Sequence, residues 1–283
     1  MNIKALFSRT HLWQWGAATV LLLLVVGVMA FVLPPAVDFH NYFRPAAQGV
    51  LHGISPYENA GFFNAPWALL PLIPIALLPE SLGRAVLVVV AFLTYAFTAY
   101  RMGAKPLAVV FFLLSPTVVQ DLLNGNLDWL AMLGFVLPRP LGIFFLAIKP
   151  QIGAVVGLFW LIEAWRDGGW RRALHDFWPI TLALGLSFVL FGLWPLRFQE
   201  NLTMWWNASL WPMSIPVGLA LLTAAIRKRS QRLAMAAAPC LSPYLLLHSW
   251  GAVLLSIVNR LPETIAAVVG LWILVAIRAA GGG

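Results

Sequence analysis

The acid best placed to do chemistry in this chain is Asp38, in the run Val37-Asp38-Phe39-His40-Asn41-Tyr42. It follows the apolar stretch of residues 12–33, which is long enough to cross a membrane. An ionisable residue at a membrane exit is a functional-site candidate by default. A carboxylate there can act as a general base and take the proton of an attacking hydroxyl. The alternatives are a helix cap and a solvated loop carboxylate.

Lys149 is the cation that draws attention, because it lies inside the otherwise apolar run of residues 141–165. A lysine at a helix centre costs about 2.5 to 3.5 kcal/mol on insertion scales, so an anionic partner is expected. That partner is either a substrate phosphate or one of two protein carboxylates, Asp121 and Asp128. Arg44 is a second phosphate candidate, the alternative being a solvated arginine at the interface.

Four polar residues form the densest polar cluster between apolar neighbours. They are Asp121, Asn124, Asn126 and Asp128. Such side chains could orient the hydroxyl groups of a sugar. They could equally form an ordinary polar turn between two helices, with Asn124 and Gly125 as its corner.

Histidine spacing predicts no metal site, and no cofactor is expected. His40 and His52 are twelve residues apart, and His248 has no partner at ligand spacing. Several aromatic residues could stack on sugar rings or form an interfacial belt. They are Tyr57, Trp67, Trp205, Trp206 and Trp211.

The composition places these residues in a membrane protein. Of the 283 residues, 61% are hydrophobic and 10% are charged, so lipid is the main solvent. The formal charge of +8 comes from Lys and Arg in short loops between apolar runs. That distribution sets membrane orientation and does not indicate a nucleic-acid partner. At about 20 residues a span, we expect one all-α integral domain, residues 1–283, with about eight to ten crossings.

We expect a multi-pass protein of the cytoplasmic (inner) membrane. The positive-inside rule orients its crossings and places the N-terminus in the cytoplasm. Between residues 34 and 166, three or five crossings both fit; three are favoured, with 66–79 and 127–137 interfacial or re-entrant. The basic clusters around Arg166 and Arg229, and Arg278, are expected inside. The favoured spans are 12–33, 82–100, 106–123, 141–165, 177–194, 211–226, 241–258 and 264–277.

The first outer loop, residues 34–80, contains a predicted amphipathic helix. Between Asp38 and Ile54, apolar residues recur at helical spacing opposite polar ones. This pattern predicts a helix lying on the membrane surface. Pro45 is tolerated only in a first helical turn, so the regular part is expected to start near Arg44 or Pro45.

Four stretches of the chain resemble one family. They are Asp38-Phe39-His40-Asn41-Tyr42 with Ala46-Ala47; Gly53-Ile54-Ser55-Pro56-Tyr57; Phe63-Asn64-Ala65-Pro66 before Leu78-Pro79; and Asn124-Gly125-Asn126 with Lys149-Pro150-Gln151. Their order and spacing over residues 12–165 resemble the polyprenyl-phosphate-mannose-dependent mannosyltransferases of glycosyltransferase family 87. The family more often has Asn-Gly-Gln where this chain has Asn126. Its late aromatic and histidine pair is represented by Ser242-Pro243-Tyr244 and His248.

The resemblance implies a GT-C membrane fold and a polyprenyl-phosphate sugar donor. It also implies a lipid or glycan acceptor, membrane lipids as surroundings, and an active site on the extracytoplasmic face with Asp38 as general base. The candidate substrate-binding residues are His40, Tyr42, Arg44, Tyr57, Asn64, Asn124, Asn126, Asp128, Lys149, Gln151 and His248.

The chemistry of such a transfer agrees with a single acid. A phosphate leaves as a stable anion, so the reaction needs a base and no general acid. Two alternatives stay open. A transporter or lipid flippase would carry charges at mid-membrane on broken helices from related halves, and a non-catalytic scaffold would lack a closed cavity.

Overall fold

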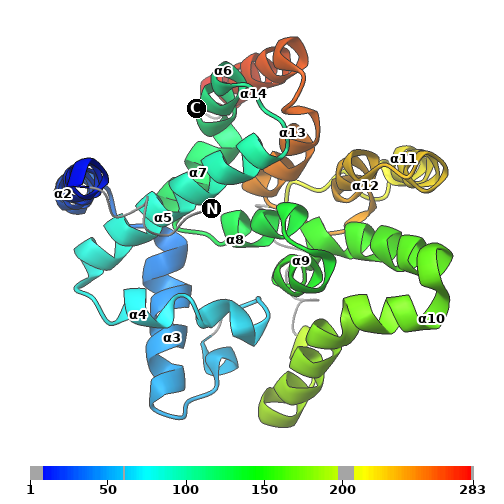
Figure 1. Ribbon diagram of the computed structural model, residues 1–283, viewed down its shortest axis with the longest axis horizontal. Coiled ribbons are helices and arrows are strands. Elements are labelled where there is room, and N and C mark those ends of the chain that lie inside the picture. Colours follow the sequence, from blue (N-terminus) through cyan, green and yellow to red (C-terminus); the bar gives the residue numbers. More distant parts are fainter. Residues whose placement is uncertain (1–8, 60, 197–206, 282–283) are drawn as a thin grey trace.

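The computed structural model describes residues 9–59, 61–196 and 207–281, and every regular element in them is a helix (Figure 1). This confirms the all-α class. The α-helices are α2 (Arg9–Val32), α3 (Arg44–Leu51), α4 (Ile73–Ala76), α5 (Glu80–Arg101), α6 (Pro106–Leu113), α7 (Pro116–Asn124), α8 (Asp128–Leu133), α9 (Arg139–Leu146), α10 (Pro150–Phe191), α11 (Ile215–Lys228), α12 (Gln231–Ala237), α13 (Gly251–Ile257) and α14 (Leu261–Gly281). Short 3₁₀ or π turns are η1 (Phe39–Phe43), η2 (Pro56–Glu58), η3 (Pro66–Leu69), η4 (Gly134–Val136), η6 (Pro239–Leu241) and η7 (Leu247–Trp250).

Among the residues that the structure describes, three helices are long and apolar enough to cross a membrane: α5, α10 and α14. Helices α6 and α7 would make a fourth span together, although they are bent by 55°. By length and composition the chain is therefore compatible with an all-α membrane protein. This is fewer than the eight to ten full spans predicted, because many of the other helices are short.

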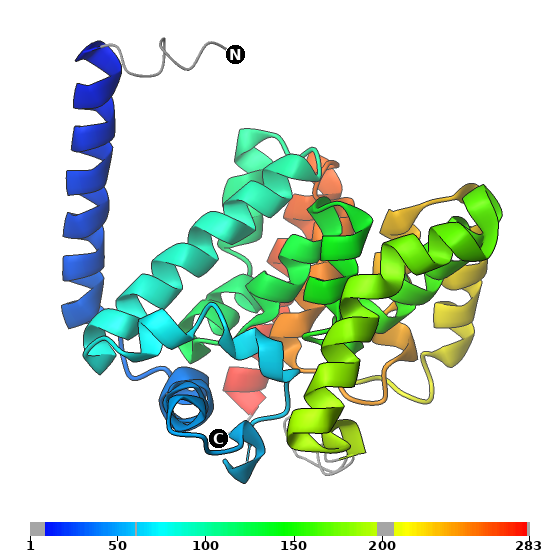
Figure 2. The same ribbon diagram turned by 60° about the horizontal axis from the view of Figure 1, so that its bottom comes forward.

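Two opposite ends of the molecule are defined by the residues gathered there. At the Asp38 end, α5 begins beside the first loop, where His40 Nδ1 lies 2.7 Å from Glu80 Oε1. At the basic end, α5 finishes at Arg101, which lines a cleft together with Arg229. Figure 2 shows α2 at one edge of the molecule, with the start of α5 beside its lower end.

The basic clusters predicted to share a side do lie together. Arg166 Nη1 donates to the Ile226 carbonyl oxygen at 2.7 Å, and Arg229 Nη1 pairs with Asp167 Oδ1 at 2.8 Å. Helix α10 is broken at Gly168 and Gly169, so its second half returns toward the Asp38 end and α11 comes back. The predicted hairpin of residues 177–194 and 211–226 therefore has its structural counterpart.

The predicted single crossing of residues 141–165 is wrong. Helices α9 and α10 are separate and pack antiparallel, so that Gly142 lies against Trp160 and Gly153 against Leu146. The break falls at Lys149, which has φ −128° and ψ 86°. A residue before proline is pushed out of the helical region, and Pro150 then starts the next helix.

This break adds two short passages between the ends. Val136 lines the basic cleft, whereas Asn126 and Lys149 line the cavity at the Asp38 end. The chain thus runs to the basic end through α8 and η4 and returns through α9. From Glu80 to Arg166 it makes five passages between these ends. Their number equals that of the less favoured alternative, but their segments differ, because residues 66–79 form no passage and residues 141–165 supply two.

The prediction that Arg278 and Asp38 lie on opposite sides is also wrong, because both residues line the same cavity. Residues 241–258 do not form one helix; they contain η6, η7 and α13 around Pro243. The chain leaves the basic end at Arg232 and is back there at Asn259, since these two side chains are hydrogen-bonded at 2.5 Å. Helix α14 then carries it to the Asp38 end (red, Figure 2).

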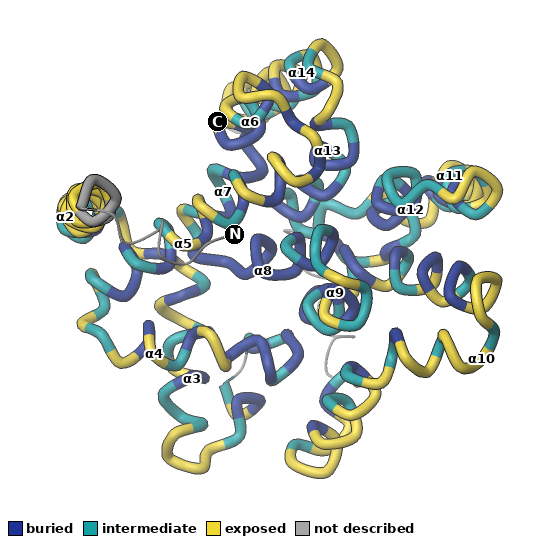
Figure 3. The backbone as a smooth tube through the Cα atoms, viewed as in Figure 1, coloured by how far each residue is buried: buried dark blue, intermediate teal, exposed yellow. Residues whose placement is uncertain are grey.

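The first loop contains the predicted helix, with a different role for its apolar face. Helix α3 starts at Arg44, as expected from Pro45. Phe39, Phe43 and Ala47 are buried in the protein, so the expectation of a helix lying with this face on the membrane is wrong. Figure 3 shows how burial is distributed along the backbone: buried residues concentrate around α8, while α2, α11 and α14 are largely exposed. Residues 66–79 contain only the short elements η3 and α4, which confirms that they form no full span.

Candidate functional site

A cavity of about 1010 Å³ opens at the Asp38 end. Its walls include Asp38, Asn126, Lys149 and His248, which come from four separate segments of the chain. The volume is at the upper end of the range typical of ligand pockets. Asp38 and the buried lysine therefore face one hollow, as the mechanism expected from the sequence requires.

Asn126 connects the acid and the lysine. Its Nδ2 donates to Asp38 Oδ2 at 2.5 Å, while its Oδ1 accepts from Lys149 Nζ at 2.7 Å and from the Leu127 amide at 2.6 Å. Two donors on Oδ1 fix the orientation of the side-chain amide, so that its NH₂ group must face Asp38. Asn126 is thus a positioning residue for the carboxylate.

The turn before Asn126 brings it to Asp38. Gly125 ends α7 in the left-handed region, with φ +67° and ψ 38°, which glycine adopts without strain. A Cβ at this position would lie 2.8 Å from the Phe39 Cβ and 3.1 Å from the Ala36 Cβ. The missing side chain therefore allows the corner to pack directly against the segment that carries Asp38, which confirms the predicted Asn-Gly corner.

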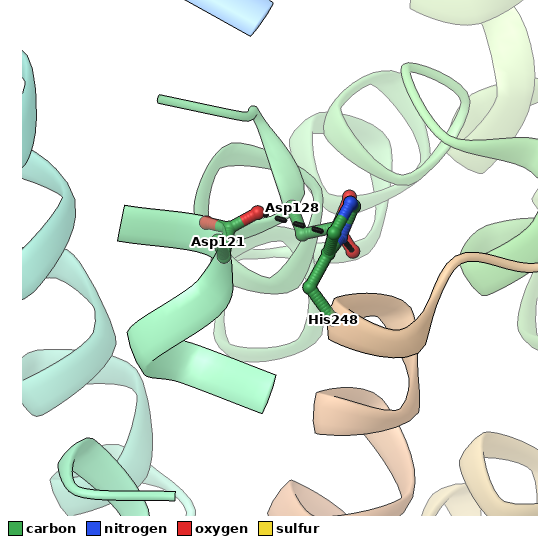
Figure 4. Close-up of side chains that lie close together, drawn as sticks. All are labelled: Asp121, Asp128 and His248. Carbon is green, nitrogen blue, oxygen red and sulfur yellow. Dashed lines mark hydrogen bonds and ion pairs between the residues drawn. The ribbon is translucent and has the colours of Figure 1, made fainter. Parts of the chain in front are cut away.

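Behind the cavity wall lies a buried polar cluster (Figure 4). Asp128 Oδ2 accepts from His248 Nδ1 at 2.8 Å and from Ser249 Oγ at 2.7 Å, and its Oδ1 lies 3.3 Å from Lys149 Nζ. Asp121 Oδ2 accepts from Tyr95 Oη at 2.7 Å. Both aspartates are fully buried. Buried carboxylates need such charged or hydrogen-bonding partners.

The cluster corrects the expectation that His248 has no partner at ligand spacing. Its partners are separated from it by 120 residues or more, a distance that local spacing does not register. One ligand atom each from Asp121, Asp128 and His248 lies within 4.8 Å of the others, so these three residues could hold a metal ion. Lys149 and a protonated imidazole would balance the same two carboxylates without one.

Most of the candidate residues predicted from the sequence line the cavity. These are Asp38, Tyr42, Asn64, Asn124, Asn126, Lys149, Gln151 and His248. Asp128 lies behind the wall and holds Lys149 and His248 in place. Lys149 therefore pairs with a protein carboxylate, as one of the two alternatives predicted, and it also lines the cavity.

Three candidates lie outside the wall. His40 is exposed and faces Glu80, and Arg44 donates to the Leu78 carbonyl oxygen at 3.4 Å. Tyr57 is buried, stacks on Trp194 at 5.7 Å and donates to the Asn64 carbonyl oxygen at 2.9 Å. The hypothesis that Tyr57 stacks on a sugar is therefore not supported by its position. Trp205 and Trp206 fall outside the described residues.

Among the polar residues of the wall, sequence reasoning missed Gln120, Asn207 and Arg278. Arg278 is the lone charge near the end of the last apolar helix, a signal that orientation rules assigned to the opposite side. Asn207 Nδ2 donates to the Pro243 carbonyl oxygen at 3.0 Å and so holds two parts of the wall together. No protein-family model matches this chain, and no curated protein or solved structure shows detectable similarity to it.

Proposed function

We propose that this protein is a membrane glycosyltransferase that moves a hexose, with mannose as the first choice, from a polyprenyl-phosphate donor to a lipid or glycan acceptor. The reaction would take place on the extracytoplasmic face. The observation that carries the proposal is the connection of Asp38 through Asn126 to Lys149 in one cavity.

Asp38 serves as the base in this proposal. Asn126 occupies its Oδ2, while Oδ1 makes no hydrogen bond within the described part of the chain. Oδ1 can take the proton of the acceptor hydroxyl as that oxygen bonds to the anomeric carbon. The bond from this carbon to the phosphate oxygen breaks in the same displacement, so the configuration at the carbon inverts.

Lys149 receives the leaving phosphate. An ammonium group has three donors, of which one is directed to Asn126, while Asp128 Oδ1 is an ion-pair partner at 3.3 Å that makes no hydrogen bond within the described residues. A further donor can reach a phosphate oxygen in the cavity. Because Asp128 and Asn126 already fix the ammonium group, little reorganisation is needed when negative charge develops on the phosphate.

The structure also offers a reason to rank a lipid flippase second. A flippase must pass a headgroup between the two ends, yet the cavity and the basic cleft share none of their lining residues. Buried side chains of α8 lie between these ends, among them Trp129, Leu130 and Met132.

The test is sugar transfer by the purified full chain in lipid, with radiolabelled polyprenyl-phosphate mannose and a set of acceptors. Asp38→Asn should lower transfer by about 10²- to 10⁴-fold, the usual worth of a general base. Glu58→Gln is the matched control, because Glu58 is an exposed acid of the same loop. Equal transfer by wild type and Asp38→Asn would refute the assignment of the base.

A further inference from the structure

A second hollow, at the basic end, is independent of the proposed active site. It is a cleft of about 400 Å³ between the end of α5, the turn η4 and the start of α12. Arg101, Arg229 and Arg232 contribute the cations, and Phe135 and Val136 form an apolar wall. Three arginines in so small a space repel one another unless anions neutralise them.

Arg232 has no carboxylate partner in the described residues. Its guanidinium donates to neutral oxygens, at 3.0 Å to the Ser256 carbonyl, at 2.5 Å to Asn259 Oδ1, and also to the Met102 carbonyl. Burial, and then the positive charge of Arg260, lower the pKa of Arg232. The guanidinium stays charged at neutral pH, so the cleft holds an uncompensated positive charge.

Arg101 adds a second one. Its guanidinium lies 5.9 Å from the centre of the Phe97 ring and makes no hydrogen bond or ion pair to the part of the chain that the structure describes. Arg229 differs, because Asp167 and Glu163 hold it at 2.8 and 3.5 Å. Two of the three arginines thus lack a counter-charge from the described residues.

We propose that this cleft binds the phosphate group of an anionic phospholipid. Guanidinium groups match phosphate oxygens in geometry and charge. The depth agrees as well, since Arg101 ends the candidate span α5 next to exposed Tyr100 and Phe97, and aromatic residues gather at the headgroup level. Basic pockets between membrane helices at this depth are suited to lipid headgroups.

A loop arginine whose sole role is to set the orientation of the chain in the membrane would be solvated and would make few contacts with other segments. Arg232 is instead partly buried among the backbone oxygens of two other segments. A free phosphate ion shares the chemistry of the headgroup, so the experiment must separate these two sources.

The experiment measures binding of water-soluble dihexanoyl phosphatidylglycerol to the full chain in a neutral detergent. Arg101→Gln should weaken binding by about tenfold or more, as expected when a charge-assisted hydrogen bond is lost. Arg171→Gln is the matched control. Arg171 is exposed over the Trp170 ring and belongs to the basic cluster around Arg166, but it does not line the cleft.

Two further ligands distinguish the outcomes. Dihexanoyl phosphatidylcholine should bind more weakly, and inorganic phosphate should fail to displace the lipid at comparable concentrations. Displacement by phosphate would overturn the assignment to a lipid and would identify the cleft as a binding site for a soluble anion. Equal weakening by Arg101→Gln and Arg171→Gln, or equal binding of the two lipids, would overturn the proposal.

A second variant tests the cleft from its other wall. Arg232→Gln should also weaken phosphatidylglycerol binding, and it should lower thermal stability because Arg232 holds Met102, Ser256 and Asn259. Arg101→Gln, which breaks no hydrogen bond within the described residues, should leave stability unchanged. None of these measurements depends on sugar transfer, so failure here and failure of the proposed function are distinguishable.

Discussion

The two hollows of this protein use positive charge in opposite ways. In the cavity at the Asp38 end, Lys149 is held at 3.3 Å from Asp128 and 2.7 Å from Asn126. In the cleft at the basic end, Arg101 and Arg232 have no carboxylate partner among the described residues. A compensated cation is fixed in place before any ligand arrives, whereas an uncompensated one awaits an anion. The first arrangement suits catalysis and the second suits binding.

The comparison of the cavity with the cleft requires that they lie on opposite sides of the membrane. A topology reporter tests this requirement and should give the largest effect. A reporter inserted after Lys105 should give a cytoplasmic signal, and one inserted after Ala280 should give an extracytoplasmic signal. The reason is that Lys105 adjoins the basic end, while Arg278 lines the cavity with Asp38. Alkaline phosphatase and green fluorescent protein fusions measure this, and identical signals at both positions would contradict the course of α14.

Removing the compensated cation should destabilise the protein strongly. Lys149→Met leaves Asp128 buried with a negative charge, which should lower the free energy of unfolding by about 3 to 5 kcal/mol. Thermal unfolding in detergent measures the loss. Asp128→Asn combined with Lys149→Met should recover part of it, because the excess negative charge of the buried cluster is gone.

Lys105→Met is the control for this loss. Lys105 is exposed, so its removal should change the free energy of unfolding by no more than about 0.5 kcal/mol. Equal destabilisation by the two lysine variants would mean that Lys149 is not compensated in the way described.

Substitution of two glycines tests whether the corner at Asn126 positions Asp38, and the expected loss of stability is smaller than for Lys149→Met. Gly125 and Gly169 have φ values of +67° and +63°, but only a Cβ at Gly125 would meet neighbouring atoms. Gly169 has ψ −153°, a region that is essentially restricted to glycine, so Gly169→Ala should cost about 1 to 3 kcal/mol. Gly125→Ala should also destabilise the protein, and it alone should lower sugar transfer, because its Cβ pushes the corner away from Asp38. Unfolding and transfer measured on both variants test this, and equal transfer would remove the corner from the site.

The sequence predicts those parts of the structure that depend on neighbouring residues, such as the boundaries of helices. Helix α5 (Glu80–Arg101) nearly matches the predicted 82–100, because one apolar run ends in an arginine. Helix α3 starts at Arg44 because Pro45 fits only a first turn. The pair Lys149-Pro150 contains the signal for the turn between α9 and α10, because a residue before proline is pushed out of the helical region.

The contacts of the site are less local and were harder to predict. Asp38 and Asn126 are 88 residues apart, and Asp128 and His248 are 120 apart. Side-chain patterns identify each residue as polar in an apolar setting, and burial of such groups requires partners. Which partners meet depends on tertiary packing, and the unexpected return of the chain between Arg232 and Asn259 is what delivers His248 to the cavity.

The smallest expected effect comes from removing divalent metal. Asp121, Asp128 and His248 could bind an ion, with their ligand atoms within 4.8 Å of one another. However, His248 Nδ1 is already hydrogen-bonded to Asp128, and Lys149 supplies one positive charge. With a protonated imidazole the cluster reaches neutrality, and a divalent ion would then bring two further positive charges into a buried space. Sugar transfer after treatment with EDTA should therefore equal that of untreated protein. A loss that Mn²⁺ or Mg²⁺ restores would make these three residues a metal centre, and Lys149 would no longer be the group that compensates Asp128.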